Sequence, residues 1–266
     1  MKLAMYQNQP ILIQDQQYRP ILNETNVQAL LLQLDQPLNL GSVQPLPDLR
    51  ELQAPITAPQ QIFAVGFNYR QHLTELATQA PQSPNVFTKF PSSLTGPAPT
   101  VQIPSPKTDW ETELVIVIGA GGRQISTAAA MNHVAGYMVG QDLSDRQLQF
   151  ANDKPQFSLA KSYANFAPTG PWLTTADEVD HLGDLILTTT VNGVEKQHSQ
   201  LKNLIFGVAD LVSYLSTIVA LVPGDLIFTG TPGGVGAGRS PQEFLQSGDQ
   251  LISQITQLGK LTIDLK

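Results

Sequence analysis

Three carboxylates are the side chains of this sequence best suited to chemistry. Glu111 and Glu113 precede an apolar, β-branched run at 114–119, and the two-residue period of a strand points both acids to one face. Neighbouring carboxylates repel each other unless a cation, a basic residue or open water lies between them. Asp142 ends a second predicted strand, 136–142, so the two strand ends could bring the three acids together. Oxygen ligands without cysteine or histidine beside them suit Mg²⁺, Mn²⁺ or Ca²⁺.

The same acids also have a simpler interpretation. Glu111 and Glu113 could decorate the exposed start of a strand, and Asp142 could cap the helix that follows it. Spacing alone leaves both interpretations open.

A polar pattern follows the third acid. We expect a helix over 142–149, which would place Asp142, Arg146 and Gln149 on one face at positions i, i+4 and i+7. An arginine and an amide beside a metal ion could hold a carboxylate or keto oxygen of a substrate. The alternative is an ordinary ion pair on a helix surface.

A histidine and a glutamate form the next candidate pair. His72 and Glu75 are three residues apart and would face each other on a helix. Glu75 could then orient the imidazole and raise its basicity, so that His72 acts as a general base towards water. A surface hydrogen bond between the two is the alternative.

Glycines crowd the segment 228–238. It resembles a phosphate loop but fails that motif, because Arg239 stands where the third glycine would be and no Gly-Lys-Ser/Thr follows. Backbone amides and the Thr231 hydroxyl could approach a small carboxylate here. A plain tight turn fits the sequence equally well.

Strands outnumber helices in the predicted element pattern. We expect strands at 62–66, 114–119, 136–142, 185–191 and 225–229, and an alternating tail at 250–266. Asn192-Gly193 indicates a hairpin turn, since both residues tolerate positive φ. Helices are expected at 126–133, with Ser126 as N-cap, and within the apolar stretch 204–222. The pattern predicts an α+β domain built on mostly β sheets.

The amino-terminal part differs from the rest of the chain. It is rich in Gln and Leu, and prolines gather between residues 37 and 59. We therefore place a boundary near residue 58, with a small cap domain at 1–58 and a catalytic domain at 59–266.

Composition excludes several classes of partner and chemistry. The 266 residues include 15 basic and 22 acidic side chains, so the net charge is −7, and no basic run could neutralise a row of phosphates. We expect neither nucleic acid nor an anionic membrane as a partner. The absence of cysteine excludes disulfides, thiol nucleophiles, zinc-thiolate sites and iron–sulfur clusters. The first residues lack the apolar stretch of a signal peptide, so we expect a cytoplasmic protein.

Taken in order, these segments and several others resemble the fumarylacetoacetate hydrolase family from about residue 62 to the end of the chain. Each fragment is weak, but their order and spacing are specific. The fragments are Val-Gly-Phe-Asn-Tyr at 65–69, Phe-Thr-Lys-Phe-Pro-Ser-Ser at 87–93, Asp-Trp-Glu-Thr-Glu-Leu at 109–114, Gly-Gln-Asp-Leu-Ser-Asp-Arg at 140–146, Leu-Ala-Lys-Ser at 159–162, Pro-Thr-Gly-Pro at 168–171 and Thr-Gly-Thr-Pro-Gly-Gly-Val-Gly at 229–236.

The resemblance implies an architecture and a metal site. The family fold is a mixed β-roll or sandwich with flanking helices, and we assume that residues 1–58 form a small cap packed against it. The resemblance assigns Glu111, Glu113 and Asp142 to a divalent cation, Mg²⁺ or Mn²⁺. It makes His72 and Glu75 a base dyad on a mobile lid. It also implies a homodimer.

The resemblance further assigns residues to the substrate. Lys161 is implied as a catalytic contact to substrate oxygens near the metal, and Arg146, Gln149 and Thr231 as contacts to a substrate carboxylate. The implied substrate is a small anionic 2-oxo acid.

The implied reaction is hydrolysis of a C–C bond in a 1,3-dicarbonyl, acylpyruvate-type acid through a metal-stabilised enolate. Family members with the same acids also decarboxylate oxaloacetate or isomerise and tautomerise unsaturated 2-oxo dicarboxylic acids. These reactions share the enolate and are the alternatives.

Overall fold

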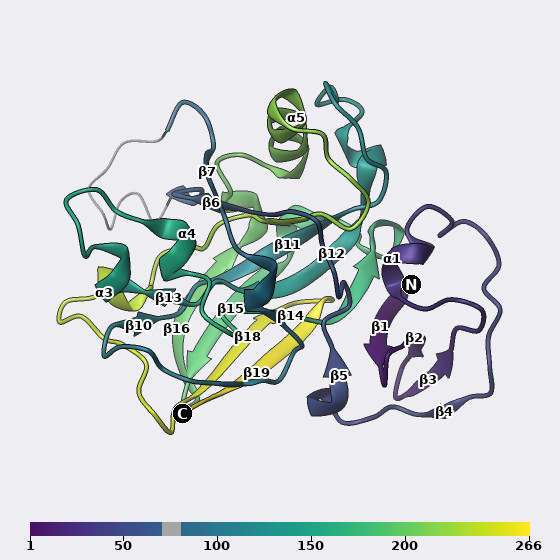
Figure 1. The fold of residues 1–266 in the computed structure, drawn as a ribbon, viewed down its shortest axis with the longest axis horizontal. Coiled ribbons are helices and arrows are strands. Elements are labelled where there is room, and N and C mark those ends of the chain that lie inside the picture. Colours follow the sequence, from purple (N-terminus) through teal and green to yellow (C-terminus); the bar gives the residue numbers. More distant parts are fainter. Residues whose placement is uncertain (71–80) are drawn as a thin grey trace.

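The computed structural model describes residues 1–70 and 81–266. Figure 1 shows two β-sheets in the middle of the molecule, with helix α5 above them, α3 and α4 at one end and the amino-terminal strands at the other. The helices of the described residues are α1 (Val27–Leu30), α3 (Arg146–Gln149), α4 (Phe157–Ala160) and α5 (Val208–Ile218). Short 3₁₀ turns are η1 (Leu49–Glu51), η2 (Pro91–Ser93), η3 (Ala130–His133), η4 (Ala176–Glu178), η5 (Leu182–Asp184), η6 (Leu201–Asn203) and η7 (Gly236–Gly238).

The described strands are β1 (Lys2–Tyr6), β2 (Gln9–Gln14), β3 (Gln17–Pro20), β4 (Gln44–Pro45), β5 (Leu52–Gln53), β6 (Ile62–Gly66), β7 (Asn85–Thr88), β8 (Leu94–Thr95), β9 (Thr100–Val101), β10 (Thr108–Asp109), β11 (Thr112–Ile118), β12 (Val134–Gln141), β13 (Ser144–Asp145), β14 (Ala167–Thr175), β15 (Ile186–Val191), β16 (Val194–Gln200), β17 (Leu226–Phe228), β18 (Gln250–Ile255) and β19 (Gly259–Leu265).

The larger sheet includes the amino-terminal strands. Its order is β4-β3-β2-β1-β14-β12-β11-β17-β6-β7. The strand β1 pairs antiparallel with β14, where Leu3 is opposite Leu173. Residues 1–58 are therefore continuous with the main sheet, and the domain boundary near residue 58 stays a prediction.

The smaller sheet has the order β16-β15-β18-β19-β9. Asn192 and Gly193 connect β15 to β16 with φ values of 50° and 78°, which is the positive-φ geometry of a two-residue hairpin turn. The predicted hairpin is confirmed, and the alternating tail forms the strands β18 and β19, which pair antiparallel.

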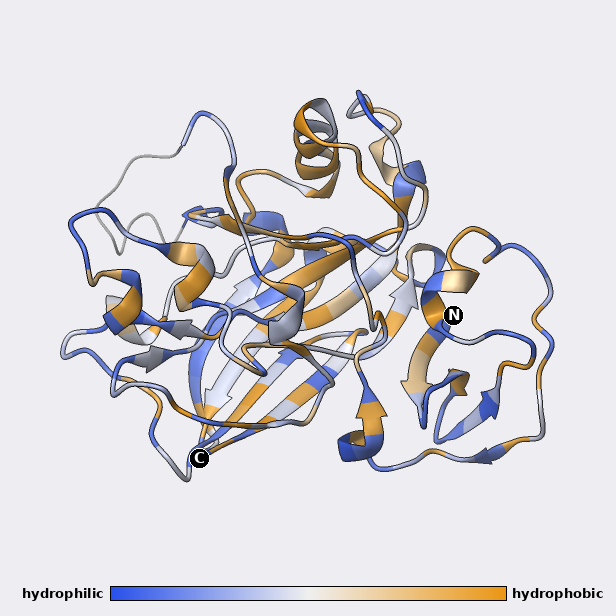
Figure 2. Ribbon diagram, in the orientation of Figure 1, coloured by the Kyte–Doolittle hydropathy of each residue, from blue (hydrophilic) through white to orange (hydrophobic). Residues whose placement is uncertain are grey.

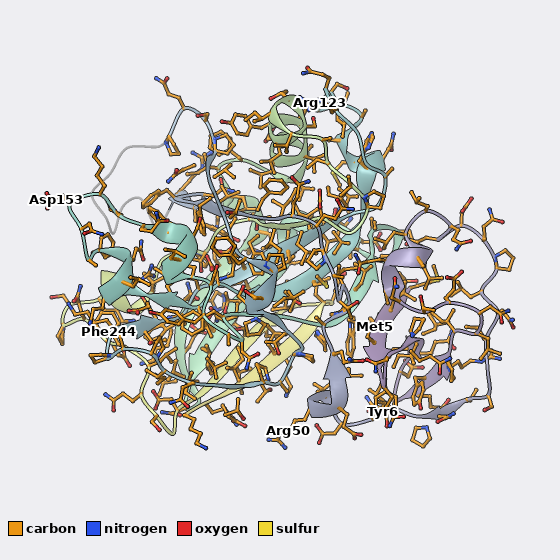
Figure 3. All side chains as sticks on the ribbon, in the orientation of Figure 1. Met5, Tyr6, Arg50, Arg123, Asp153 and Phe244 are labelled. Carbon is orange, nitrogen blue, oxygen red and sulfur yellow. The ribbon has the colours of Figure 1, made fainter. Side chains whose placement is uncertain are left out.

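The strand β11 is buried on both faces. Leu114, Ile116 and Ile118 pack in a core with the smaller sheet and α5, and Val115 and Val117 pack in a second core with β1, β6 and β17. Burial of both faces explains why the sequence of β11 is continuously apolar and does not alternate between apolar and polar residues. Figure 2 shows apolar residues along the central strands and α5, and in Figure 3 the labelled Arg50, Arg123 and Asp153 lie at the periphery. The predicted α+β class, with a mixed β-roll or sandwich and flanking helices, is confirmed.

Two predicted helices are corrected by the structure. The segment 126–133 forms only turns and η3, because its hydrogen bonds span three residues, as from the Ala129 N–H to the Ser126 carbonyl, and β12 begins at once at Val134. The helix predicted over 142–149 begins only at Arg146. In the first half of this segment, Ser144 and Asp145 form β13 and pair with β10. Asp145 is the N-cap of the helix, so Asp142 does not lie on a helix face.

No helix of the described residues combines the length and apolar character needed to cross a lipid bilayer.

The packing of β1 predicts that the amino-terminal segment stabilises the whole fold. Leu3 is fully buried in the core that contains Val115 and Leu226, so Leu3→Ala should lower the free energy of unfolding by about 2–5 kcal/mol. Chemical denaturation followed by circular dichroism measures this, and Leu32→Ala, at a side chain that is 71% exposed, is the control. Equal effects of the two substitutions would show that β1 is not part of the core.

Candidate metal and active site

The three acids meet because β11 and β12 are antiparallel neighbours. Glu113 is opposite Gly140, and beyond the last ladder pair the Asp142 N–H donates to the Glu111 carbonyl oxygen over 2.8 Å. Carboxylate oxygens of Glu111, Glu113 and Asp142 lie within 4.8 Å of one another, and all three residues are buried. The structure thus brings the predicted acids together through a strand pairing.

Two buried lysines form ion pairs with these acids. The Lys161 Nζ lies 2.6 Å from Glu111 Oε2 and 2.8 Å from Asp142 Oδ2, and it donates to Ser144 Oγ over 2.7 Å. The Lys89 Nζ lies 2.6 Å from Asp142 Oδ1 and also donates to the carbonyl oxygen of Lys161. Both lysines are almost fully buried, so their charges are compensated by the acids.

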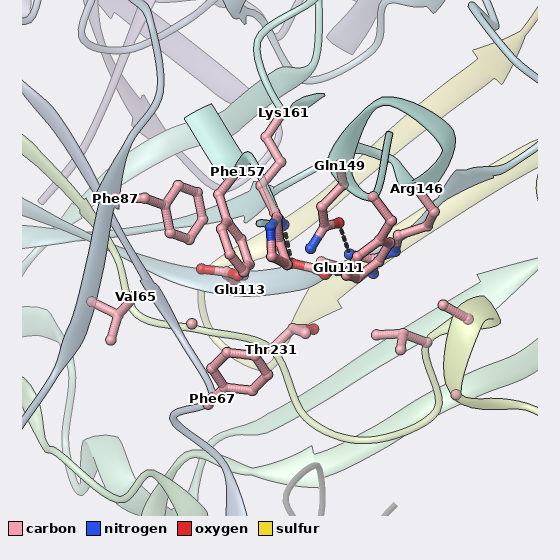
Figure 4. Close-up of a pocket in the computed structure, with 16 residues that line it drawn as sticks. Val65, Phe67, Phe87, Glu111, Glu113, Arg146, Gln149, Phe157, Lys161 and Thr231 are labelled. Carbon is pink, nitrogen blue, oxygen red and sulfur yellow. Dashed lines mark hydrogen bonds and ion pairs between the residues drawn. The ribbon is translucent and has the colours of Figure 1, made fainter. Parts of the chain in front are cut away.

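Arg146 connects the acids to a second polar group. Its Nε lies 2.8 Å from Asp109 Oδ2, one terminal nitrogen lies 2.5 Å from Glu111 Oε1, and the other donates to Gln149 Oε1 over 2.9 Å. A guanidinium has five N–H groups, so two remain available beside the pocket. Because its oxygen is held by Arg146, the Gln149 side chain presents its NH₂ group to the pocket (Figure 4).

Asp109 couples this arginine to the glycine turn. Besides Arg146, it accepts hydrogen bonds from the N–H groups of Gly236 and Ala237 over 2.7 and 3.0 Å. Ala237 lines the same pocket as Arg146. One buried carboxylate therefore fixes both the arginine and the opposite backbone wall.

The start of the glycine turn holds Glu113. The Gly230 N–H donates to Glu113 Oε2 over 2.7 Å, and Gly230 has a φ of 97°. A β-carbon at this position would lie 2.8 Å from the Val65 carbonyl oxygen, so only glycine fits both the backbone angle and the space.

Thr231 lines the pocket with a hydroxyl that has internal partners. The hydroxyl donates to the Thr112 carbonyl oxygen over 2.9 Å and accepts from Gln197 Nε2 over 2.8 Å. Its hydrogen would have to leave Thr112 before it could bind a substrate carboxylate. The substrate role of Thr231 stays a prediction.

Two buried amides support the start of β11. The Gln197 Oε1 accepts from the Thr112 N–H over 3.1 Å, and Gln141 Oε1 accepts from the Glu111 N–H. Both side chains lie between the two sheets and satisfy backbone groups that no strand partner reaches. Sequence reasoning missed them because a glutamine in an alternating strand looks like an exposed residue.

The charges of the site explain the shifted acidities. Burial raises the pKa of Glu113 well above its usual range, and the charges of Asp142 and Glu111 raise it further. Burial would also raise the pKa of Glu111, but the charges of Lys161 and Arg146 outweigh it and hold that pKa at about 2. Among the described residues, no salt bridge reaches Glu113.

These residues fit a divalent cation. Four buried acids face three basic groups, and Glu113 is the acid for which the described residues supply no basic partner, so its raised pKa reflects an unmet need for the positive charge that a divalent cation would supply. Each carboxylate oxygen has two lone pairs, so the bonds to Lys89, Lys161 and Arg146 leave acceptor capacity. An oxygen-only ligand set of this kind suits Mg²⁺, Mn²⁺ or Ca²⁺. The four acids are Asp109, Glu111, Glu113 and Asp142.

A pocket of about 150 Å³ opens beside the acids. Pockets for drug-sized ligands have roughly 300–1,000 Å³, so this one suits a small acid. The predicted Arg146, Gln149, Lys161 and Thr231 all line it, whereas His72 and Glu75 lie outside the described residues and keep their predicted roles. The lining residues are Val65, Gly66, Phe67, Phe87, Glu111, Glu113, Arg146, Gln149, Phe150, Pro155, Phe157, Lys161, Thr231, Val235, Ala237 and Gly238 (Figure 4).

Lys89 and Asp109 are the charged residues of the site that sequence reasoning did not assign. Asp109 precedes Glu111 and Glu113 by the same two-residue step, so the strand period could have indicated it. Lys89 gave no such signal, because its partner Asp142 is 53 residues away.

The site predicts a specific effect of Glu113 on metal binding. Glu113→Gln keeps an acceptor for the Gly230 N–H but removes the charge, so it should weaken Mn²⁺ binding at least about tenfold while the melting temperature of the metal-free protein stays unchanged. Isothermal titration calorimetry measures the affinity. Glu195→Gln, at an exposed acid, is the matched control, and equal affinity for both variants would remove Glu113 from the metal site.

The buried ion pair of Asp109 with Arg146 should contribute more to the free energy of unfolding than an exposed ion pair does. Asp109→Asn breaks a fully buried pair and should lower the free energy of unfolding by about 3 kcal/mol, because Arg146 loses a counter-charge. Asp264→Asn removes one partner of an exposed ion pair with Arg50 and should change the free energy of unfolding by less than about 1 kcal/mol. Similar losses in urea denaturation would contradict the role of Asp109.

Comparison with known proteins agrees with this geometry. The family model for the fumarylacetoacetate (FAA) hydrolase C-terminal region matches residues 61–266. The mitochondrial oxaloacetate tautomerase FAHD2A of Bos taurus is 40% identical over 208 residues, which are 77% of this chain and 66% of that protein. The chain thus spans just under two thirds of the length of this relative.

Solved structures extend the likeness to the whole chain. A crystal structure from Mycobacterium smegmatis is 43% identical, with a TM-score of 0.94 and coverage of 100% of this chain and 99% of the other. The fumarylacetoacetate hydrolase of Exiguobacterium antarcticum is 30% identical, with a TM-score of 0.89 and the same coverage. The match to the family model covers all residues of the acid cluster and the pocket. The chain belongs to the fumarylacetoacetate hydrolase family.

Proposed function

We propose that this chain is a divalent-cation-dependent hydrolase that cleaves a C–C bond of an acylpyruvate-type 2-oxo acid through its enolate. The observation that carries the proposal is the position of the buried acids, Lys161 and Arg146 at one end of a small, otherwise apolar pocket. This arrangement favours a small anion that develops negative charge on oxygen during the reaction.

Arg146 and Gln149 bind the substrate carboxylate in this proposal. The two remaining N–H groups of Arg146 and the amide NH₂ of Gln149 are donors beside the pocket, and Asp109 and Glu111 keep the guanidinium in place. A divalent cation held by Glu111, Glu113 and Asp142, Mg²⁺ or Mn²⁺, supplies Lewis-acid stabilisation of the substrate oxygens when bound.

His72 and Lys161 carry the proton transfer and the charge. His72, oriented by Glu75, removes a proton from water, and the hydroxide adds to the acyl carbonyl carbon. The C–C bond breaks, and its electron pair forms the enolate of pyruvate while the acyl group leaves as a carboxylic acid. The ammonium of Lys161 stabilises the enolate oxygen, and a proton returned to carbon completes pyruvate.

Keto–enol tautomerisation of oxaloacetate is the second candidate. The bovine relative at 40% identity is named for this reaction, which needs the same enolate but no attack by water. Decarboxylation of oxaloacetate and isomerisation of unsaturated 2-oxo acids would use the same stabilisation.

The location and assembly form part of the proposal. We propose that the protein is cytoplasmic and forms a homodimer. We also propose that neither nucleic acid nor a membrane is its partner. The name of the bovine relative places that protein in mitochondria. Fractionation of the source cells tests the location, and sedimentation velocity tests the dimer.

The role of His72 predicts a separation of binding from turnover. His72→Ala should leave Mn²⁺ affinity intact, because the three acids hold the cation, and abolish turnover of acetylpyruvate. Calorimetry and a spectrophotometric assay measure the two quantities. Full turnover by this variant would remove the histidine from the mechanism.

One assay separates the candidate reactions. The purified protein with Mg²⁺ or Mn²⁺ is given acetylpyruvate, fumarylpyruvate and oxaloacetate, and pyruvate release and loss of the enol absorbance are followed. We expect pyruvate from the acylpyruvates. Reaction of oxaloacetate alone would contradict the hydrolase and support the second candidate.

A further inference from the structure

A buried glutamine of the smaller sheet reaches the metal site from behind. Gln197 lies on β16, is 1% exposed and does not line the pocket. Its amide oxygen accepts hydrogen bonds from the Thr112 N–H over 3.1 Å and from the Thr189 hydroxyl over 2.7 Å. Its NH₂ group donates to Thr231 Oγ1 over 2.8 Å and to the Pro232 carbonyl oxygen over 3.0 Å. These bonds use the full hydrogen-bonding capacity of a glutamine side chain.

Backbone groups fix the direction of these hydrogen bonds. The Thr112 N–H can only donate and the Pro232 carbonyl can only accept, so the amide of Gln197 has one possible orientation. Its NH₂ group therefore donates to the Thr231 oxygen, and the hydroxyl hydrogen of Thr231 goes to the Thr112 carbonyl oxygen. Although Thr231 lines the pocket, its hydrogen is used inside the protein.

These bonds hold the part of β11 that carries the acids. Thr112 lies between Glu111 and Glu113, and the neighbouring strand β17 pairs with β11 only further along. The N–H and carbonyl groups of Thr112 therefore have Gln197 and Thr231 as partners in place of a strand. Because the side chains of a strand leave the backbone in alternating directions, the orientation of the Thr112 peptide groups sets the directions of Glu111 and Glu113.

The same amide also holds the glycine turn. Thr231 and Pro232 directly follow Gly230, whose N–H donates to Glu113 Oε2 over 2.7 Å. By binding Thr231 and Pro232, Gln197 fixes the part of the turn next to this contact. One buried side chain thus connects the two segments that determine where the Glu113 carboxylate lies.

We infer that Gln197 is a positioning residue for the metal site, and that Thr231 links it to β11 and does not bind the substrate carboxylate. The inference rests on the divalent cation of the proposed function and adds the residues that set the geometry of its ligands. Both residues act through the backbone of Thr112.

Binding of Mn²⁺ without substrate tests the inference. Gln197→Met keeps the length of the side chain but loses its hydrogen bonds, and Thr231→Val keeps the shape but loses the hydroxyl. Each should weaken Mn²⁺ binding at least about tenfold in isothermal titration calorimetry, which is typical for residues that orient metal ligands. The electron paramagnetic resonance spectrum of the bound Mn²⁺ should change as well, because it reports on the arrangement of the ligands.

Further variants separate positioning from a general loss of stability. Thr231→Ser keeps the hydroxyl, so it should retain the wild-type affinity for Mn²⁺. Thr174→Val removes another buried hydroxyl, one with no hydrogen-bond partner among the described residues, so the affinity should also stay unchanged. Because Gln197 and Thr231 act through one link, the double variant Gln197→Met/Thr231→Val should bind Mn²⁺ about as weakly as the weaker single variant.

The outcomes distinguish this inference from the hydrolase proposal. Wild-type Mn²⁺ affinity in Gln197→Met and Thr231→Val would overturn it, and a raised KM for acetylpyruvate in Thr231→Val would then make Thr231 a substrate contact. An equal loss of affinity in Thr174→Val would also overturn it, and a wild-type protein that binds no Mn²⁺ would remove the metal site as well. If the variants weaken Mn²⁺ binding but the wild-type protein hydrolyses no acylpyruvate, the positioning role stands and the hydrolase proposal fails.

Discussion

Compensation of buried charge is the constraint on which the rest of this structure depends. Asp109, Glu111, Glu113 and Asp142 are all buried, and the charges of Lys89, Lys161 and Arg146 balance three of the four. Removing carboxylates and ammonium groups from water is costly, and buried pairs of this kind rarely add stability over apolar packing. The cluster is therefore best explained by its chemistry, because Glu113, for which the described residues supply no basic partner, suits a divalent cation.

The fold serves this cluster by bringing together distant parts of the chain. The hairpin of β11 and β12 supplies three acids, and each basic residue comes from a different segment, after β7, after α4 and at the start of α3. The glycine turn after β17 closes the site through backbone N–H groups bound to Glu113 and Asp109. These long-range bonds give the pocket one charged end and one apolar end.

Local patterns in the sequence predicted the parts of the fold that depend on neighbouring residues. The two-residue period placed Glu111 and Glu113 on one face, and Asn192-Gly193 predicted its hairpin, because strand geometry and positive φ are local properties. The prediction of a helix over 142–149 is wrong in its first half, because Ser144 and Asp145 pair with the distant strand β10.

Tertiary contacts decided the rest. No local signal linked Lys89 to Asp142 or Gln197 to the start of β11, since those partners meet only after the sheets pack. The family resemblance supplied the metal assignment and the role of Lys161, which spacing left open. The rings of Phe67, Phe87 and Phe157 likewise meet from three segments, and in the sequence they look like ordinary core residues.

The central claim is that the three acids at the end of the β11–β12 hairpin hold a divalent cation. Anomalous diffraction from crystals soaked in Mn²⁺ tests it most directly. The account predicts one strong anomalous peak in contact with carboxylate oxygens of Glu111, Glu113 and Asp142. Absence of a peak there, with Lys161 alone bridging Glu111 and Asp142, would contradict it.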